Sequence, residues 1–181
     1  MNEVGPVSKF DLNAFKQIRS TVVEFQVESL KFLGSSPALV LDIAPQIHDG
    51  VSKLCAAQIK VETIDIDPKY SPTYVGDICK ETVLPSSRFD AVFCTEVLEH
   101  VSNPFEAVKE ISRVLKPGGY LFASSPFGFR IHGPLPDNWR ISEHGWRELL
   151  KSFRDLKITS LNDPERFLMP LHYCVSARKQ F

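Results

Sequence analysis

Three aspartates stand where they could bind a polar ligand. Asp42, Asp65 and Asp77 each lie at or just after the end of a short apolar run in this 181-residue chain. Such runs indicate buried strands, and the carboxyl ends of parallel strands meet at one edge of a sheet. Asp65 follows Asp42 by 23 positions, close to the roughly 20 residues that separate a nucleotide-binding turn from a ribose-binding acid. The spacing therefore predicts a crevice for a ligand that contains a ribose.

The turn after the first of these strands lacks the usual glycines. Ala44, Pro45 and Gln46 follow Asp42, whereas glycine lets the backbone approach a ligand closely and adopt positive φ. The chain contains neither GxGxxG nor GxxxxGK[ST], the motifs that cradle phosphates. A ligand with a ribose but no pyrophosphate fits this combination. Two alternatives stay open: the variant turn reshapes the pocket, or it closes the pocket.

A second group of reactive side chains lies in the stretch EVLEH. If this stretch is helical, Glu96, Glu99 and His100 share one side, because positions three and four apart are neighbours on a helix. Two carboxylates and an imidazole can hold a divalent metal. The residues alone leave open whether they do.

The long loop from 126 to 142 carries the best candidates for acid–base chemistry. His132 is the preferred general base, because a neutral imidazole titrates near working pH. Asp137 would orient His132 or bind substrate, and Arg140 would bind an anionic group such as a phosphate. The alternative is that Asp137 and Arg140 pair with each other and brace the loop.

The elements that must position these side chains alternate between strand and helix. Apolar runs predict strands over 38–43, 60–66, 74–75, 89–94, 120–124, 156–161 and 172–177. Helical periodicity and capping residues predict helices over 10–33, from Asp49 or Ser52, from Pro104, and from Ser142. This order is typical of an α/β, Rossmann-like, doubly wound and mostly parallel sheet. The last two strands have no helix between them, which predicts an antiparallel C-terminal edge pair.

The chain is of single-domain length. We expect residues 1–37 to form a helix that caps either a sheet edge or the pocket, and residues 38–181 to form the ligand-binding unit. The net charge of −1 provides no global attraction for nucleic acid or membrane. Four widely spaced cysteines and the absence of an apolar run of about 20 residues favour a cytoplasmic protein. Nothing in the sequence indicates the oligomeric state.

Five stretches in this order resemble the class I S-adenosylmethionine-dependent methyltransferases, in particular their type 11 group. They are VLDIA, TIDIDP, VGDI, FDAVFCTEVLEHVSNP and ISRVLKPGGYLFASSP. The resemblance runs from Leu39 to about Phe153. It implies S-adenosylmethionine as cofactor, with Asp65 and Ile66 at the ribose, Asp77 at the adenine amino group and Ile78 flanking the ring.

The resemblance also assigns the other end of the cofactor. Asp42 would lie near the methionine moiety, with Ala44 and Gln46 in the variant loop beside it. Cys94 and Glu96 would lie near the cofactor at the end of the fourth strand. His100 would pack in the loop that faces the substrate.

The activity that the resemblance implies is methyl transfer to a small molecule, for example to a hydroxyl of a sugar or a related metabolite. The loop around His132 is similar to a stretch of type 11 enzymes in sugar and natural-product pathways. One alternative is a non-catalytic, methyltransferase-like binding subunit. The other is a metal-assisted RNA methyltransferase, since some RNA and quinone-precursor methyltransferases use an EVLEH-like cluster with a metal. EVLEH is also common without metal, and we expect no metal here.

Overall fold

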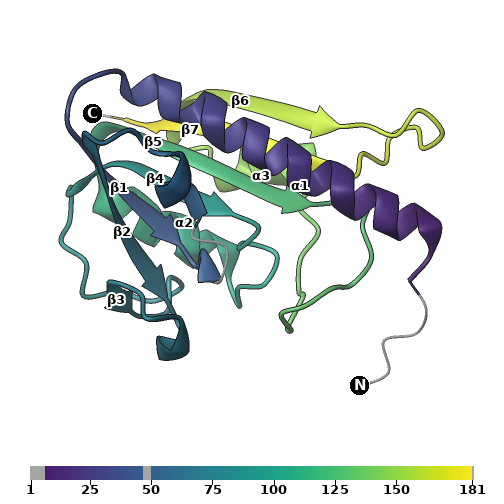
Figure 1. The fold of residues 1–181 in the computed structure, drawn as a ribbon, viewed down its shortest axis with the longest axis horizontal. Helices are drawn as coiled ribbons and strands as arrows, with labels where there is room; N and C mark the ends of the chain where they lie inside the picture. The colour runs from purple at the N-terminus through teal and green to yellow at the C-terminus, as the bar shows by residue number, and fades with distance from the viewer. Residues whose placement is uncertain (1–6, 47–49, 181) are drawn as a thin grey trace.

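A single sheet of seven strands organises the protein in the computed structural model, which describes residues 7–46 and 50–180. The strand order is β3-β2-β1-β4-β5-β7-β6 (Figure 1). The strands are β1 (Ala38–Ile43), β2 (Ile59–Asp65), β3 (Tyr74–Val75), β4 (Phe89–Thr95), β5 (Leu115–Pro126), β6 (Phe153–Leu161) and β7 (His172–Lys179). β1 to β5 pair in parallel, whereas β7 is antiparallel to both β5 and β6. The predicted fold class, with its antiparallel edge pair, is confirmed.

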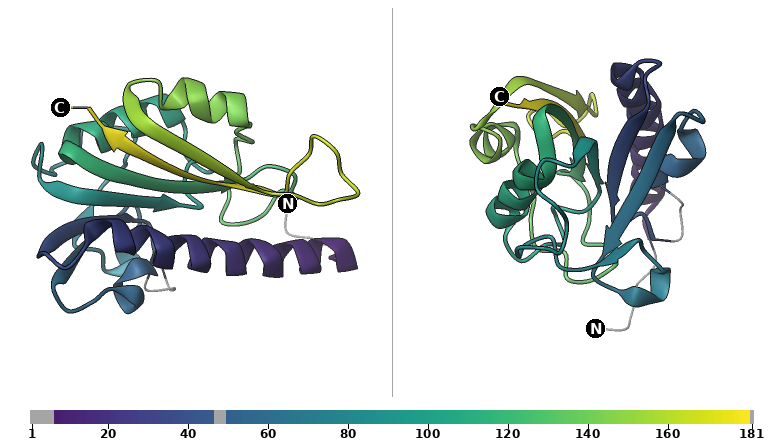
Figure 2. Two further views of the ribbon diagram at one scale, coloured as in Figure 1. Left: turned by 90° about the horizontal axis from the view of Figure 1, so that it is seen from above. Right: turned by 90° about the vertical axis from the view of Figure 1, so that its left-hand side faces the viewer.

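Helices cover both faces of the sheet (Figure 2). The long helix α1 (Lys9–Leu30) lies on one face, and α2 (Pro104–Val114) and α3 (Glu143–Leu149) lie on the other. Alternate residues of the central strands supply the two cores. Val40, Phe93 and Phe122 pack in the core beneath α1 with Leu30, whereas their neighbours, such as Leu41, pack on the side of α2 and α3. None of the described helices is long and apolar enough to cross a bilayer.

The helix boundaries follow from local hydrogen bonds. The side chains of Ser8, Asn103 and Ser142 accept backbone N–H groups in the first turns of α1, α2 and α3. α1 continues into the 3₁₀ turn η1 (Lys31–Leu33) and ends at Gly34, whose φ is +65°. The predicted start of α2 at Pro104 and the predicted cap of α3 at Ser142 are confirmed.

Two local predictions are wrong. The α-helix expected after β1 is only the 3₁₀ turn η3 (Gly50–Leu54), while Asp49 lies outside the described residues. The expected helix would turn both Val51 and Leu54 inward; Val51 is buried, but Leu54 is exposed, because the turn is too short to present a second apolar position inward. On α2, helical spacing predicts Phe105 in the buried stripe, but Phe105 is exposed, and the inward stripe starts from Pro104 and Ala107. A further 3₁₀ turn, η4 (Pro68–Tyr70), follows β2.

Candidate active site

A cavity of about 890 Å³ opens at the carboxyl ends of the parallel strands. Asp42, Asp65 and Asp77 all line it, so the predicted convergence of the three aspartates is confirmed. α1 forms one wall, and the Gln26 amide of that helix donates to Thr95 Oγ1 at the end of β4, 3.1 Å away. α1 therefore packs on one face of the sheet and also borders the cavity, and its role as a cap of the pocket stays a prediction.

Asp65 presents an oxygen that lacks a partner. Its Oδ1 accepts the Asp67 backbone N–H at 2.8 Å, whereas its Oδ2 is buried without a hydrogen bond from any described residue. A buried carboxylate oxygen without a donor is costly, so this atom indicates a polar ligand with hydroxyl donors. The ribose of S-adenosylmethionine supplies such donors, and the residue present therefore fits this cofactor.

The residues predicted at the ribose and adenine also line the cavity. Ile66 is exposed at 68%, while Ile78 is buried. Asp77 is held by the Cys79 backbone N–H, which donates to Oδ1 at 2.9 Å. Cys94 is different: it is fully buried in the core and does not line the cavity, because alternate residues of β4 point to opposite faces. Thr95 and Glu96, the next residues, line the cavity in its place.

The glycine-poor turn keeps a glycine-like backbone. Ala44 has a φ of +50° and Gln46 a φ of +53°, the left-handed region that non-glycine residues rarely adopt. Both residues line the cavity. The chain therefore holds the backbone shape of a ligand-binding turn against local strain, and strained backbone of this kind clusters at functional sites. Residues 47–49, which include His48, lie outside the described residues.

The Asp42 side chain stabilises this turn through a hydrogen bond. Its Oδ2 accepts the backbone N–H of Val51 at 2.9 Å. Burial raises the pKa of Asp42 from 3.8 to about 7, although the hydrogen bond from Val51 opposes the shift. Gly50 passes so close that a Cβ there would lie 1.8 Å from Asp42 Oδ2, and its φ is +48°. This turn therefore requires a glycine at position 50, which lies after positions 44–46, where glycines are expected.

His132 and Asp137 form the pair that the sequence predicts. Asp137 Oδ2 lies 3.0 Å from His132 Nδ1 and accepts the His132 backbone N–H at 2.9 Å. Burial lowers the pKa of His132, so its imidazole is neutral near pH 7. Because the carboxylate only accepts, Nδ1 carries the hydrogen and Nε2 keeps a free electron pair.

The structure gives Arg140 a different role from the predicted one. Its guanidinium forms two contacts with the Asp137 carboxylate and donates to the carbonyls of Phe129, Arg130 and Trp139. These bonds occupy its donors and brace the loop, and Arg140 does not line the cavity. The pairing lowers the pKa of Asp137 to about 2 against the opposing effect of burial. The bracing alternative therefore describes Arg140, which has no donor left for a substrate anion.

The loop of His132 is fastened to the EVLEH turn. This stretch is a turn and not a helix. The backbone N–H groups of Asn138 and Trp139 donate to the Glu99 carbonyl at 2.7 and 3.0 Å, and the Trp139 indole donates to the Val101 carbonyl. These bonds bring the imidazole rings of His132 and His100 close together, with their centroids 5.1 Å apart, although 32 positions separate the two residues in the chain.

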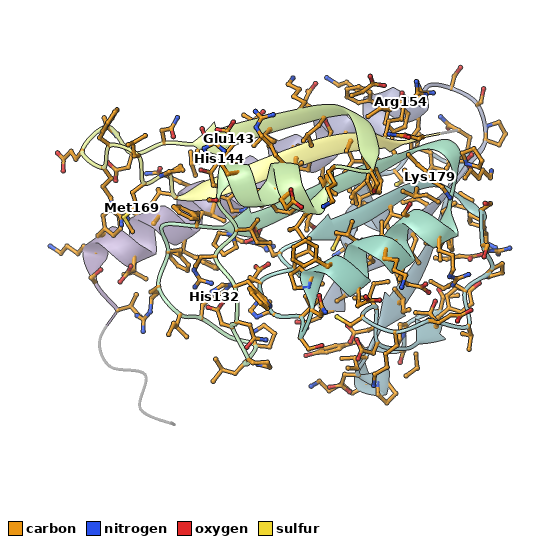
Figure 3. The ribbon with its side chains drawn as sticks, turned by 180° about the vertical axis from the view of Figure 1, so that it is seen from behind. His132, Glu143, His144, Arg154, Met169 and Lys179 are labelled. Atoms are coloured by element: carbon orange, nitrogen blue, oxygen red, sulfur yellow. The ribbon has the colours of Figure 1, made fainter. Side chains whose placement is uncertain are left out.

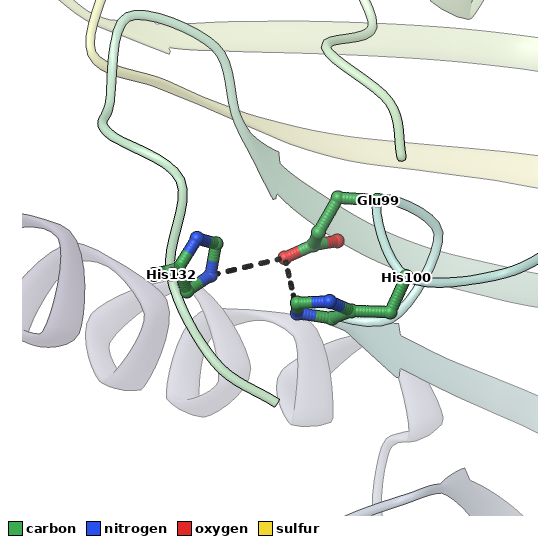
Figure 4. A group of neighbouring side chains, drawn as sticks. All are labelled: Glu99, His100 and His132. Carbon is green, nitrogen blue, oxygen red and sulfur yellow. Dashed lines mark ion pairs between the residues drawn. The ribbon is translucent and has the colours of Figure 1, made fainter. Parts of the chain in front are cut away.

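Glu99 lies between the two imidazoles (Figure 4). His100 Nε2 is 3.7 Å and His132 Nε2 is 4.0 Å from Glu99 Oε1. The Glu99 side chain is fully buried, and neither carboxylate oxygen has a hydrogen-bond partner among the residues described. Burial, reinforced by the charge of Glu96, raises the pKa of Glu99 well above its ordinary value. One ligand atom from each of these three residues lies within 4.8 Å of the others.

The free electron pairs of this cluster converge. His100 Nδ1 lies 2.8 Å from the Pro136 carbonyl, which can only accept, so Nδ1 carries the hydrogen. The Nε2 atoms of His100 and His132 therefore face Glu99 as acceptors, and an ionised Glu99 carboxylate adds two further acceptor atoms. Histidines that bind metals almost always donate their other N–H to a carbonyl or carboxylate in this way. The donor set therefore fits a divalent cation.

The remaining histidines lie elsewhere. Figure 3 shows His144 beside Glu143 at the start of α3, away from His132, and His144 is exposed, as expected for a surface residue. His172 is fully buried on β7, and its Nε2 bonds to Glu96 Oε1, which the Ser124 hydroxyl also contacts at 2.8 Å. The sequence alone assigns no role to Ser124 or His172, because pairing of β4 with β5 brings Ser124 to Glu96 and pairing of β5 with β7 brings His172 there.

Curated relatives share part of the chain. Residues 24–123 match the family described as methyltransferase domain. The ubiquinone biosynthesis O-methyltransferase of Xanthomonas oryzae pv. oryzae is 35% identical over 98 residues, which are 54% of this chain and 37% of that protein. The protein of the same description from Pseudomonas syringae pv. tomato is 33% identical over 79 residues, 44% of this chain and 33% of that protein. The matches thus span little more than a third of these relatives.

Solved structures share the fold. A S-adenosylmethionine-dependent methyltransferase from Archaeoglobus fulgidus has a TM-score of 0.67 and 18% identity, and the match covers 90% of this chain and 94% of that one. A phosphoethanolamine N-methyltransferase from Haemonchus contortus, solved with S-adenosylhomocysteine, has a TM-score of 0.65 and 18% identity over 87% of this chain and 53% of that one. The family match, the fold and the three strand-end aspartates agree: the chain belongs to the type 11 group of class I S-adenosylmethionine-dependent methyltransferases.

Proposed function

We propose that the protein transfers the methyl group of S-adenosylmethionine to a hydroxyl of a small molecule. The observation that carries this proposal is the convergence of His100 and His132, which line the cavity with the predicted cofactor residues, on the buried Glu99 carboxyl group. A hydroxyl must lose its proton as its oxygen attacks the methyl carbon, and this cluster offers the acceptors for that step. The name O-methyltransferase borne by the curated relatives supports a hydroxyl acceptor.

The chain's own groups would contribute mainly by position. Methyl transfer forms an oxygen–carbon bond and breaks the sulfur–carbon bond of the sulfonium, so the acceptor oxygen must be in line with that bond. Asp65 would hold the ribose, and the turn at Ala44 and Gln46 would border the methionine moiety. His132, oriented by Asp137, would take the hydroxyl proton on Nε2.

We further propose that Glu99, His100 and His132 hold a divalent cation, in contrast to the metal-free expectation from the sequence. When bound, such a cation lowers the pKa of a hydroxyl and neutralises negative charge. The two buried oxygens of Glu99 support this proposal, because neither has a hydrogen-bond partner among the described residues. His132 Nε2 cannot act as a ligand and as a free base at once, so the two versions of the site are separable by experiment.

The test combines binding and activity. Calorimetry with S-adenosylhomocysteine should show binding, and labelled S-adenosylmethionine should methylate at least one member of a panel of catechols and sugars. A chelator should abolish transfer, and Mg²⁺ or Mn²⁺ should restore it. Binding of S-adenosylhomocysteine without transfer to any acceptor would favour a non-catalytic subunit, and absent binding would refute the proposal. Methyl transfer that persists in the presence of a chelator would support His132 as the general base and refute the cation site.

A sugar acceptor, a cytoplasmic location and the exclusion of RNA stay predictions. Gln46 borders an open cavity, and this favours a catalytic protein over a binding subunit whose pocket the variant turn has closed.

A further inference from the structure

Behind the cavity wall, a buried histidine contacts a carboxylate that faces the cavity. His172 lies on β7 with its side chain fully buried, and its Nε2 bonds to Glu96 Oε1. Glu96 follows β4, lines the cavity and keeps 19% of its side chain exposed. The sulfur of Cys174 lies 3.7 Å from His172 Nδ1 and packs against the other side of the ring.

The two internal hydrogen bonds to Glu96 meet on one oxygen. An ionised carboxylate only accepts, so His172 donates through Nε2–H and Ser124 donates through its hydroxyl, both to Oε1. No hydrogen bond to Oε2 is recorded within residues 7–46 and 50–180. With Oε1 held from inside the protein, Oε2 is the oxygen left for the cavity.

The backbone at Glu96 increases the need for this support. Its φ of +59° lies in the left-handed region, which a glutamate adopts only when its surroundings compensate. The Glu96 backbone N–H donates to the Ser124 carbonyl at 3.1 Å, and Ser124 itself is fully buried. β5 and β7 therefore hold both the main chain and the side chain of Glu96, since Ser124 and Cys174 are register partners.

The charges around Glu96 indicate which ligand its Oε2 atom would bind. Glu96, His100 and His132 line the same cavity, and the negative charge of Glu96 acts on both Glu99 and His132. Two neighbouring carboxylates repel each other, and a bound cation relieves that repulsion. Directed toward the cluster, Glu96 Oε2 would add a second carboxylate to the two imidazoles and Glu99.

We propose that His172 is a positioning residue that holds Glu96 so that its free oxygen faces the Glu99–His100–His132 cluster and strengthens divalent cation binding there. This inference rests on the cation site of the proposed function. Residues that orient a metal-binding group from behind typically change metal affinity by 10–100-fold when they are replaced.

The test replaces the ring and measures Mn²⁺ binding directly. His172→Leu removes the donor, whereas His172→Gln keeps an N–H at the position of Nε2. His172→Asn stays polar, but its amide is too short to reach Glu96. His144→Leu, on the exposed start of α3, is the matched control. Free Mn²⁺ is followed by electron paramagnetic resonance, S-adenosylhomocysteine affinity by calorimetry, and folding by thermal unfolding.

We expect His172→Leu and His172→Asn to weaken Mn²⁺ binding at least tenfold while S-adenosylhomocysteine affinity stays within about twofold. His172→Gln should lie within about threefold of the wild type, and His144→Leu should match it. If the leucine variant does not fold, the asparagine and glutamine variants decide between the outcomes.

Wild-type Mn²⁺ affinity in a folded His172→Asn variant would overturn the inference alone, as would equal losses in the asparagine and glutamine variants. A wild-type protein that binds no Mn²⁺ would overturn the cation site and the inference with it. Cofactor binding and methyl transfer would still be measured independently in that case.

Discussion

Replacing Asp42 by asparagine should make the stability of the protein less sensitive to pH. Burial raises the pKa of Asp42 from 3.8 to about 7, so the folded state keeps a proton that the unfolded chain releases. Since the folded state then binds more protons between these two pH values, its stability falls as pH rises through that window. The asparagine oxygen can still accept the Val51 backbone N–H, while the variant has no carboxylate to ionise.

The magnitude follows from the pKa difference. One pKa unit corresponds to about 1.4 kcal/mol, so an ionised Asp42 costs the fold about 4 kcal/mol above pH 7. Most of this cost, about 3 kcal/mol, accumulates between pH 5 and pH 8. For a domain of this length, the difference amounts to a shift in unfolding temperature of about 6–12 °C.

Urea unfolding at pH 5.0, 6.5 and 8.0 measures the effect. The free energy of unfolding of Asp42→Asn should exceed that of the wild type at pH 8 and approach it at pH 5. Asp155→Asn is the matched control, because Asp155 is exposed and its φ of +53° suits asparagine. Parallel pH profiles for the wild type and Asp42→Asn would refute the conclusion that the folded protein retains this proton.

Three further substitutions test the site. Asp65→Ala should weaken S-adenosylhomocysteine binding about 10–100-fold in calorimetry, because it removes a carboxylate worth about 1.5–3 kcal/mol in charge-assisted hydrogen bonds; an unchanged affinity would place the ribose elsewhere. Gly34→Ala, with a φ of +65°, a ψ of −151° and no atom within 4 Å, should cost the backbone strain alone, about 1–3 kcal/mol. Gly50→Ala should destabilise the fold by more than about 3 kcal/mol, because steric overlap of its Cβ with Asp42 at 1.8 Å adds to the strain at a φ of +48°. Equal losses in urea unfolding would contradict the steric account. Arg140→Lys should lower the free energy of unfolding by about 3 kcal/mol, because lysine cannot replace the paired guanidinium contacts with buried Asp137. The affinity for the cofactor should change little. A selective rise in the Michaelis constant for an acceptor would instead support a role of Arg140 in substrate binding.

The sheet and its ligand edge were predictable because their signals are local. Apolar runs that end in Asp42 and Asp65 read as strands from period and length alone, and parallel strands bring their ends together by geometry. The same holds for the caps at Asn103 and Ser142, where a short polar side chain precedes the first turn. Neither conclusion needs long-range contacts.

Predictions failed where residue type and spacing do not show which way a side chain points or which groups take its hydrogen bonds. Cys94 has the right position in the sequence, but the alternation of β4 turns it into the core. Arg140 has the right chemistry, but carbonyls of its own loop take its donors. The missing glycines suggested a damaged turn, whereas the surrounding structure holds Ala44 and Gln46 at positive φ. Propensity does not report which strain a tertiary structure will support.

The sequence by itself determined the order of the strands and helices, the aspartates at the strand ends and the family to which the chain belongs. Each of these is a matter of residue type and spacing along the chain. Only the tertiary structure brought Glu99, His100 and His132 within 4.8 Å of one another and placed His172 behind Glu96. The physical reason is that these groups meet through backbone hydrogen bonds of the loop after β5 and through a side-chain hydrogen bond between residues 76 positions apart, which no local pattern encodes.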